Sequence, residues 1–251
     1  MAKGSRGGKR TGSSQSSVVS QQSVSTLANF MGLDDDGKVT SVINGISDDV
    51  PDFLSDSAFQ RFMYNNELDG KPQIVDDKTL DSMSGQDIFR TVNSVYDSRN
   101  DVGYSALEIA QQIQYGDFTR FSDTGGSVYG KGLYFSNDYF GSTSYGYNRN
   151  NVKKTAVVRC KLNQNAKIID YGTLGSMYRT ELNSGTKLAT SLSKAVNGDT
   201  KSALSIFALS KGYNVITSSK STSVSDTYFN ILDRSVLTMS SDVKGASRSW
   251  N

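Results

Sequence analysis

The pattern of apolar and polar positions predicts several helices in the C-terminal two-thirds of the chain. Residues 105–116 open with a Ser-x-x-Glu capping box at Ser105 and Glu108, carry apolar residues at helical spacing, and end at a glycine. These features predict a helix. Two further helices are expected near 186–196 and 200–211, and the second carries small and apolar residues on one face before a glycine.

Runs of β-branched and aromatic residues predict the strands. The runs lie at 87–92, 133–136, 155–162, 166–169, 213–216 and 228–232. Strands and helices do not alternate in a regular rhythm, which favours an α+β fold over a doubly wound parallel sheet.

The N-terminal third has a different pattern. Residues 1–26 are rich in Ser, Gly and Gln, with basic but no acidic residues, and we expect them to be a disordered basic tail. Residues 27–83 predict a small helical extension, because an apolar face recurs at helical spacing from residue 58 to residue 63. Residues 71–75 are expected to be an extended connection. The main domain is then predicted at 84–240, with a C-terminal tail at 241–251.

Composition limits the chemistry that is open to the chain. Its 251 residues, 36% of them hydrophobic, suit one sizeable core plus extensions, and its net charge of +2 creates no strong field for nucleic acid or membranes. The sequence has no histidine and only one cysteine, Cys160, which excludes imidazole catalysis and makes a metal site unexpected. We expect neither secretion through a signal peptide nor a membrane span.

The candidate chemistry centres on residues 129–136, Tyr-Gly-Lys-Gly-Leu-Tyr-Phe-Ser. Two glycines bracket a lysine directly before an aromatic strand, and glycine lets a ligand approach the backbone closely. Ser142 lies eight residues beyond Tyr134, and Tyr145 lies eleven residues beyond it. Glycine-rich turns before strands are common, and these aromatic residues can also be ordinary core residues.

This string and its spacing resemble the ADP-ribosyltransferase and poly(ADP-ribose) polymerase superfamily. The resemblance implies a split β-sandwich of two mainly antiparallel sheets with flanking helices and an NAD cleft. It also implies that Ser142 hydrogen-bonds the nicotinamide amide, that Tyr145 and Tyr134 hold the nicotinamide ring between them, and that Gly132 lies against the ligand. A flat, electron-poor ring is well held between aromatic faces, which agrees with this arrangement.

An upstream strand should supply the first residue of the family motif. The polymerase branch uses a histidine there, whereas the arginine-first, mono-ADP-ribosyltransferase branch uses arginine followed by glycine. Arg90 and Thr91 stand at that place. The resemblance implies that Arg90 binds the NAD phosphates or ribose, with Thr91 in the position of the glycine. Residues 116–127 resemble the loop that covers NAD, and Arg120 in it is a second phosphate candidate. A strand-ending arginine is otherwise usually a solvated charge.

The last strand of the family carries a catalytic glutamate, which holds the ribose 2′-hydroxyl and stabilises the oxocarbenium-like transition state. Residues 225–235 form the matching segment here and contain no glutamate. The nearest acid is Asp226, so the resemblance implies a catalytic set of Arg90, Asp226 and Tyr134. A plain turn role for Asp226 stays open. Asp233 is expected to pair with a nearby Arg or Lys.

These residues favour a mono-ADP-ribosyltransferase that transfers ADP-ribose from NAD to a macromolecule and releases nicotinamide. A protein is the favoured acceptor. The alternative is an inactive protein of this fold that serves as a virion or binding component. The chain also resembles phage-encoded proteins, some of which are carried in the virion and modify host machinery. Virion and/or host cytoplasm is therefore the expected location. Residues 1–80 are a candidate docking segment for a capsid or tail partner, and the basic tail is a candidate for nucleic acid.

Overall fold

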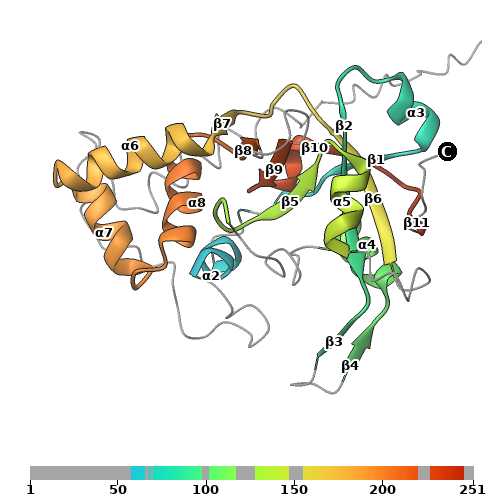
Figure 1. The fold of residues 1–251 in the computed structure, drawn as a ribbon, viewed down its shortest axis with the longest axis horizontal. Helices are drawn as coiled ribbons and strands as arrows, with labels where there is room; N and C mark the ends of the chain where they lie inside the picture. Colours follow the sequence, from blue (N-terminus) through green and yellow to red (C-terminus); the bar gives the residue numbers. More distant parts are fainter. Residues whose placement is uncertain are drawn as a thin grey trace, which may run out of the picture.

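The computed structural model describes residues 58–65, 68, 70–97, 102–116, 128–146, 155–219 and 227–245. This part of the chain forms a mixed α/β structure with a nine-stranded mixed sheet and seven α-helices (Figure 1). The strands of the sheet are β1 (Gln73–Val75), β2 (Asp87–Asn93), β5 (Leu133–Ser136), β6 (Thr155–Leu162), β7 (Ile168–Asp170), β8 (Val215–Ser219), β9 (Thr227–Ile231), β10 (Leu237–Ser240) and β11 (Lys244–Gly245).

The strands follow the order β1-β10-β6-β2-β5-β9-β8-β7, and β11 also pairs with β6. The β1–β10 and β7–β8 pairs are parallel, and the other pairs of this sheet are antiparallel. A fold that mixes helices with strands was expected from the sequence, and the resemblance implied two mainly antiparallel sheets. Hydrogen bonds join nine of the described strands into one sheet, whose β2–β5 pair has a single aligned position, Phe89 opposite Ser136.

The helices include those expected from the sequence and three others, α3, α5 and α6. The capping box at Ser105 is present at the start of α4, with both of its hydrogen bonds. The helices are α2 (Ala58–Asn65), α3 (Asp77–Ser82), α4 (Ala106–Tyr115), α5 (Tyr139–Gly146), α6 (Tyr171–Asn183), α7 (Lys187–Ala195) and α8 (Thr200–Ser210). None of these described helices is long and apolar enough to cross a bilayer.

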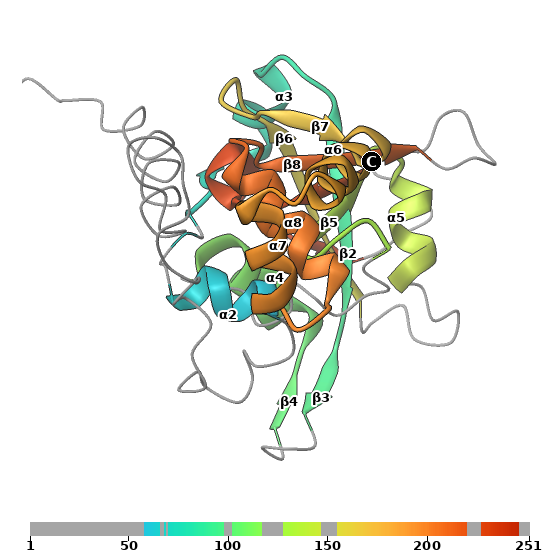
Figure 2. The same cartoon turned by 90° about the vertical axis from the view of Figure 1, so that its left-hand side faces the viewer.

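Helices α4 and α5 cover opposite faces of β2, as Figure 2 shows. Successive side chains of a strand point to opposite faces. Ile88 and Val92 therefore lie in the core cluster with the apolar side of α4. Phe89 faces the other way and meets Tyr139 of α5 edge-on, with ring centroids 5.5 Å apart.

A second core cluster lies between α2, α6, α7, α8 and the β7–β8 edge of the sheet; we call these four helices the helical layer (Figure 1). Its fully buried residues include Phe62, Leu174, Leu192 and Phe207. Helices α6 to α8 all lie between β7 and β8 in the chain, so the helical layer is mostly an insertion between two paired strands.

The segment before residue 84 joins both cores. The Phe59 amide in α2 donates to Ser202 Oγ of α8 at 2.9 Å, and the Gly70 amide donates to Asp233 Oδ1 at 3.0 Å. The predicted extended connection contains β1, which pairs with β10. Elements on both sides of residue 84 thus share one sheet and one core, while the division into an extension and a main domain stays a prediction.

Asp233 and Arg234 form the corner after β9. Asp233 accepts hydrogen bonds from the Gly70 amide and from the amide and hydroxyl of Ser235. The predicted pairing of Asp233 with a cation is therefore wrong, because a short carboxylate is drawn to the amides that begin the 3₁₀ turn η3 (Arg234–Val236). Arg234 is fully buried and donates to the carbonyls of Ile113 and Gly116 at 2.7 Å, at the end of α4.

An ion cluster fastens α3 to the sheet. Arg159 of β6 is buried and pairs with Asp87 of β2, Nη2 to Oδ2 at 2.6 Å, and with Asp81 of α3. Lys244 of β11 pairs with Asp77 of α3 at 3.1 Å. The sheet and the helix are thus joined by ion pairs around the buried Arg159, while the side chains of Asp81 and Lys244 are 60% and 40% exposed.

A separate hairpin connects β2 to α4. Its strands, β3 (Val95–Asp97) and β4 (Val102–Tyr104), pair with each other and not with the nine-stranded sheet. Both views show this hairpin projecting away from the rest of the molecule (Figures 1 and 2).

Candidate functional site

The candidate site lies where β2 and β5 separate. The two strands are aligned at Phe89 and Ser136, and a side chain of β2 also reaches β5. Arg90 Nη1 donates to the carbonyl oxygen of Tyr134 at 2.9 Å. Arg90 is therefore half-buried between two strands and is not the solvated strand-end charge that the sequence also allowed.

The charge of Arg90 persists in this setting. Burial lowers the pKa of Arg90 to about 10, and the nearby Tyr134 opposes part of this shift. Arg90 is thus protonated at neutral pH. A guanidinium at the edge of a protein interior is screened less than one in water, and its planar fork of donors matches phosphate or carboxylate oxygens.

Two hydroxyl groups meet on the other face of β2. Thr91 Oγ1 and Ser142 Oγ lie 3.1 Å apart, and both side chains are at least half-buried. Helix α5 places Ser142 there, because its first turn is held by Asp138, whose carboxylate accepts from the amides of Phe140 and Gly141. One hydrogen bond between two hydroxyls leaves the pair with a further donor and further acceptor sites, which suits a carboxamide.

The second part of the site is the turn at residues 130–132, which we call the Gly-Lys-Gly turn. Gly130 and Gly132 have φ values of 101° and 151°, a region that glycine occupies readily. A Cβ on Gly132 would also collide with Asn230 Oδ1 and approach the carbonyl oxygen of Ile231 to 2.8 Å. Both glycines are therefore required by the local geometry.

The side chains of Tyr134 and Asn230 hold the backbone of this turn. The Tyr134 hydroxyl donates to the Gly130 carbonyl at 2.6 Å and accepts from the Tyr129 amide at 3.0 Å. Asn230 Nδ2 lies 3.2 Å from the carbonyl oxygens of both Tyr129 and Lys131. Because its hydroxyl is committed to the turn, Tyr134 can offer a ligand its ring face.

Two residues of this arrangement were not predicted from the sequence. Asn230 in β9 is 1% exposed and Ser205 in α8 is 0% exposed. Ser205 Oγ accepts from the Lys131 amide and donates to the Lys131 carbonyl, both at 2.7 Å. The only signal in the sequence was a polar residue inside an apolar run, since buried polar groups nearly always have partners.

Three tyrosines pack together beside the turn. Tyr129 stacks on Tyr228 of β9, with centroids 6.2 Å apart, and meets Tyr171 of α6 edge-on at 5.2 Å. The helical layer therefore contacts the turn through aromatic as well as polar groups.

Three predicted site residues are not described by the structure. Arg120 and Asp226 lie outside the described residues, and so does the side chain of Tyr145, whose backbone belongs to α5. Thr227, the neighbour of Asp226 in the chain, is held at the β5–α5 junction. Its amide donates to Asn137 Oδ1 at 2.8 Å, and its carbonyl accepts from the Asn137 amide. The chain therefore enters β9 next to α5.

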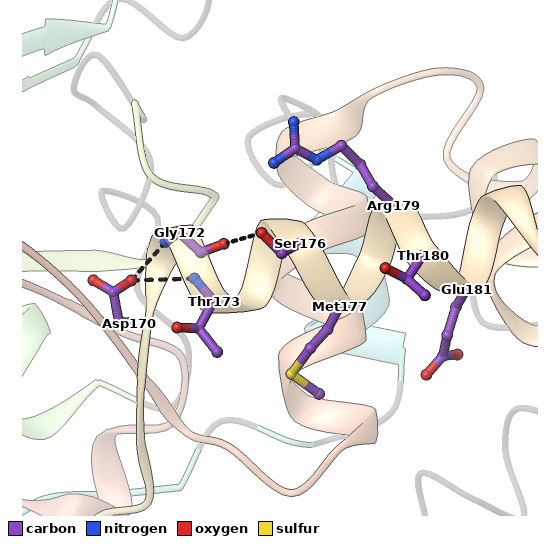
Figure 3. A pocket seen from close by; sticks show the side chains of 8 residues that line it. All are labelled: Asp170, Gly172, Thr173, Ser176, Met177, Arg179, Thr180 and Glu181. Atoms are coloured by element: carbon purple, nitrogen blue, oxygen red, sulfur yellow. Dashed lines mark hydrogen bonds between the residues drawn. The ribbon is translucent and has the colours of Figure 1, made fainter.

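The structure also has a shallow pocket of about 860 Å³ along α6 (Figure 3). Its polar groups are already engaged: Asp170 caps the helix, Arg179 Nε donates to the Gly175 carbonyl, and Glu181 pairs with Lys211 at 2.6 Å. The predicted site residues are not among those that line it, which are Asp170, Gly172, Thr173, Ser176, Met177, Arg179, Thr180 and Glu181. We therefore do not assign this pocket a ligand.

In the described part of the chain, no group of three or more His, Cys, Asp or Glu residues could hold a metal ion. Comparisons of the chain with protein-family models, with curated proteins and with solved structures found no match. The site at the β2–β5 junction is thus defined by its own geometry: a half-buried cation, a pair of hydroxyls and an anchored glycine turn.

Proposed function

We propose that this chain is a mono-ADP-ribosyltransferase that binds NAD at the β2–β5 junction, transfers ADP-ribose to a protein acceptor and releases nicotinamide. One observation carries the proposal. Two hydrogen bonds, Arg90 to Tyr134 and Thr91 to Ser142, join motif residues that are 44 and 51 positions apart in the chain. The two bonds bring the described motif residues together at neighbouring positions of β2, with Arg90 and Thr91 pointing to opposite faces of the strand, and this proximity supports the proposal.

The chemistry of each group fits a part of NAD. The Arg90 guanidinium suits the diphosphate or a ribose hydroxyl, and the Thr91–Ser142 pair suits the carboxamide of nicotinamide. The ring of Tyr134 offers an aromatic face, and Gly132 lets the ligand approach the backbone. Tyr145 belongs to the same helix as Ser142, three positions later, and we propose that its ring covers the other side of the nicotinamide.

The sheet gives further support. Its strands divide into β1-β10-β6-β2 on one side and β5-β9-β8-β7 on the other, and the two halves meet at one aligned residue pair. We propose that these halves correspond to the two sheets of a split β-sandwich, with the site at the seam between them.

In the proposed reaction the bond between the nicotinamide nitrogen and ribose C1′ breaks, and its electrons leave with nicotinamide. The ribose gains oxocarbenium character until an acceptor nucleophile bonds to C1′ and loses its proton. Asp226 would hold the ribose 2′-hydroxyl and stabilise the positive charge on the sugar. An aspartate is one methylene shorter than glutamate, so the chain before β9 must bring it closer to the sugar.

The first test measures nicotinamide released from NAD by the full chain, alone and with host lysate as a source of acceptors. We expect Arg90→Ala, Tyr145→Ala and Asp226→Ala each to lower the rate by about 100-fold, because each removes a group that stabilises the transition state or positions NAD. Asp226→Glu should retain activity. Arg179→Ala, at an exposed arginine of α6, is the matched control and should act like the wild type.

The variants separate the parts of this proposal. Activity that survives in Asp226→Ala but not in Arg90→Ala would keep the enzyme and remove Asp226 from the catalytic set. Circular dichroism of every variant shows whether lost activity is lost structure. No release by the wild type under either condition would contradict the transferase function.

A second candidate function is an inactive NAD-binding or virion component, and two observations favour it. Thr91 stands where the family has a glycine, and its hydroxyl is hydrogen-bonded to the hydroxyl of Ser142. The sequence of β9 also contains no acid. NAD that binds without nicotinamide release would support this alternative. A virion or host-cytoplasm location, and a capsid or tail partner bound through residues 1–80, belong with either function as proposals.

A further inference from the structure

Helix α8 carries two fully buried serines that face different partners. Ser205 Oγ bonds to both backbone groups of Lys131 in the Gly-Lys-Gly turn. Ser202, one helical turn earlier, accepts from the Phe59 amide at 2.9 Å and donates to Asp199 at 2.5 Å. The two hydroxyls are equally buried, at 0% exposure, and only Ser205 contacts the candidate site.

We propose that Ser205 is a positioning residue for the site: it holds the Gly-Lys-Gly turn in the shape that the ligand requires, although α8 itself carries no residue of the motif. That the ligand is NAD rests on the function proposed above. The anchoring of the turn by Ser205 can be tested without any ligand.

The turn needs an external anchor because of its composition. Gly130 and Gly132 both adopt positive φ values, and glycine has more backbone freedom to lose than any other residue. A turn built on two glycines keeps one shape only if its polar groups are bound. Fixing that shape before the ligand arrives removes an ordering cost from binding.

Ser205 makes a contact with the Lys131 amide that Asn230 Nδ2 does not make. Asn230 Nδ2 also reaches the Lys131 carbonyl, at 3.2 Å, but an NH₂ group is a donor and cannot accept from the Lys131 amide. Ser205 Oγ is the acceptor for that amide at 2.7 Å. A hydroxyl both accepts and donates, so one atom fixes the N–H and the C=O of the same residue.

The fit between α8 and the turn is also close. A Cβ placed on Gly130 would lie 2.7 Å from Ser205 Oγ, so the helix and the turn touch with no room for a side chain. Removing the Ser205 hydroxyl therefore opens a small gap directly under the turn and leaves the turn less constrained.

The test compares Ser205→Ala with Ser202→Ala, which removes an equally buried hydroxyl from the same helix but does not contact the turn. Hydrogen exchange of the Lys131 amide, followed by NMR, reports the turn directly. We expect exchange at Lys131 to be at least about tenfold faster in Ser205→Ala than in Ser202→Ala, because a lost hydrogen bond opens the amide to solvent. Urea unfolding of both variants separates this local effect from a global loss of stability.

Enzyme kinetics give the second readout. We expect Ser205→Ala to raise the KM for NAD about tenfold while kcat at saturating NAD stays within about twofold, because binding has to reorder the turn and the bound state is then the same. Ser202→Ala should change neither. If Ser205→Ala does not fold, Ser205→Cys keeps a weak donor and acceptor and should exchange at an intermediate rate.

Equal exchange rates of the Lys131 amide in the two alanine variants would overturn the positioning role of Ser205, whether or not the protein binds NAD. If the Lys131 amide exchanges faster in Ser205→Ala alone, and the wild type binds NAD, the full proposal is supported. If the amide exchanges faster in Ser205→Ala alone but the wild type binds no NAD, the anchoring role is supported and the proposed function is contradicted.

Discussion

Thr91 and Ser142 share a hydrogen bond, and Thr91 stands where the family that the sequence resembles has a glycine. The threonine side chain fills the space over the strand that a glycine would leave open, and its hydroxyl fixes the position of Ser142 Oγ at 3.1 Å. A ligand amide would therefore meet two hydroxyls that are already oriented toward each other.

We expect Ser142→Ala to weaken NAD binding about tenfold, because the carboxamide of the bound nicotinamide loses its hydroxyl partner. Thr91→Val keeps the shape of the side chain but removes the hydroxyl that orients Ser142, and we expect a smaller loss, of about threefold. Isothermal titration with NAD measures both. Thr91→Ser, which restores the hydroxyl, is the control; if Thr91→Val binds as tightly as this control, the pair does not orient the ligand.

The ion cluster of α3 shows how an element is held at the edge of the sheet. Burial alone would raise the pKa of Asp77, but hydrogen bonds from the Ser240 hydroxyl and Lys244, together with the charge of Arg159, outweigh burial and hold the pKa below its ordinary value. The folded protein thus binds a proton at Asp77 less readily than the unfolded chain does.

This difference predicts an acid-dependent loss of stability. The stabilisation from Asp77 is complete above about pH 4, the ordinary pKa of an aspartate, and is lost as the pH falls through the lower pKa of the folded state. Asp77→Asn should be less stable than the wild type at pH 7, by about 1 kcal/mol, and the difference should shrink below pH 4. Urea unfolding at a series of pH values measures this.

Asp242→Asn is the control for the acid series, because Asp242 is exposed and lies in the turn after β10. A difference between Asp77→Asn and the wild type that stays constant from neutral to acidic pH would show that the ionised carboxylate of Asp77 does not stabilise the fold.

The elements α2 and β1 decide how the N-terminal region can be tested for a partner. Removal of residues 1–80 would take away α2, which fills the helical core, and β1, which pairs with β10. We expect this deletion to abolish cooperative thermal unfolding. Removal of residues 1–57 leaves every described contact in place and should preserve it.

Circular dichroism on heating distinguishes the two deletions, and a pull-down of a capsid or tail partner should use the shorter one. Cooperative unfolding of the chain without residues 1–80 would contradict a structural role for α2 and β1. A partner still captured without residues 1–57 would place its binding surface elsewhere.

The sequence predicted some elements well because they carry local signals. Helix α4 has a capping box and an apolar stripe, and the β-branched run at 155–162 coincides with β6. Helix α5 was not predicted, since its sequence is rich in glycine and serine, and its order comes from the Asp138 cap and the packing of Tyr139 on Phe89. Helix α6 was missed as well, because Gly172 and Gly175 weaken its pattern.

The same distinction holds for the site. A motif within one stretch of chain identified Tyr134 and Ser142, and a resemblance in order along the sequence identified Arg90. Asn230 and Ser205 could not be found in this way, because they reach Lys131 across 99 and 74 residues. Only tertiary packing makes them part of the site.

At the scale of the whole molecule, two cores meet at the site. The core cluster that contains the apolar side of α4 supports β2 and β5 from one side, and the helical layer supports the Gly-Lys-Gly turn from the other. The geometry of the site therefore depends on the packing of both cores. A substitution in either core can alter the Gly-Lys-Gly turn without contacting a ligand.

The parallel pair of β1 with β10 has a consequence for how the protein is made. The Gly70 amide finds its acceptor, Asp233, 163 residues later in the chain. A ribosome synthesises α2 and β1 early, but neither has its partner until α8 and then β10 have emerged. The nascent chain therefore carries an unpaired strand and an uncovered apolar helix while the intervening elements are made, and β1 finds its partner only after β10 has emerged.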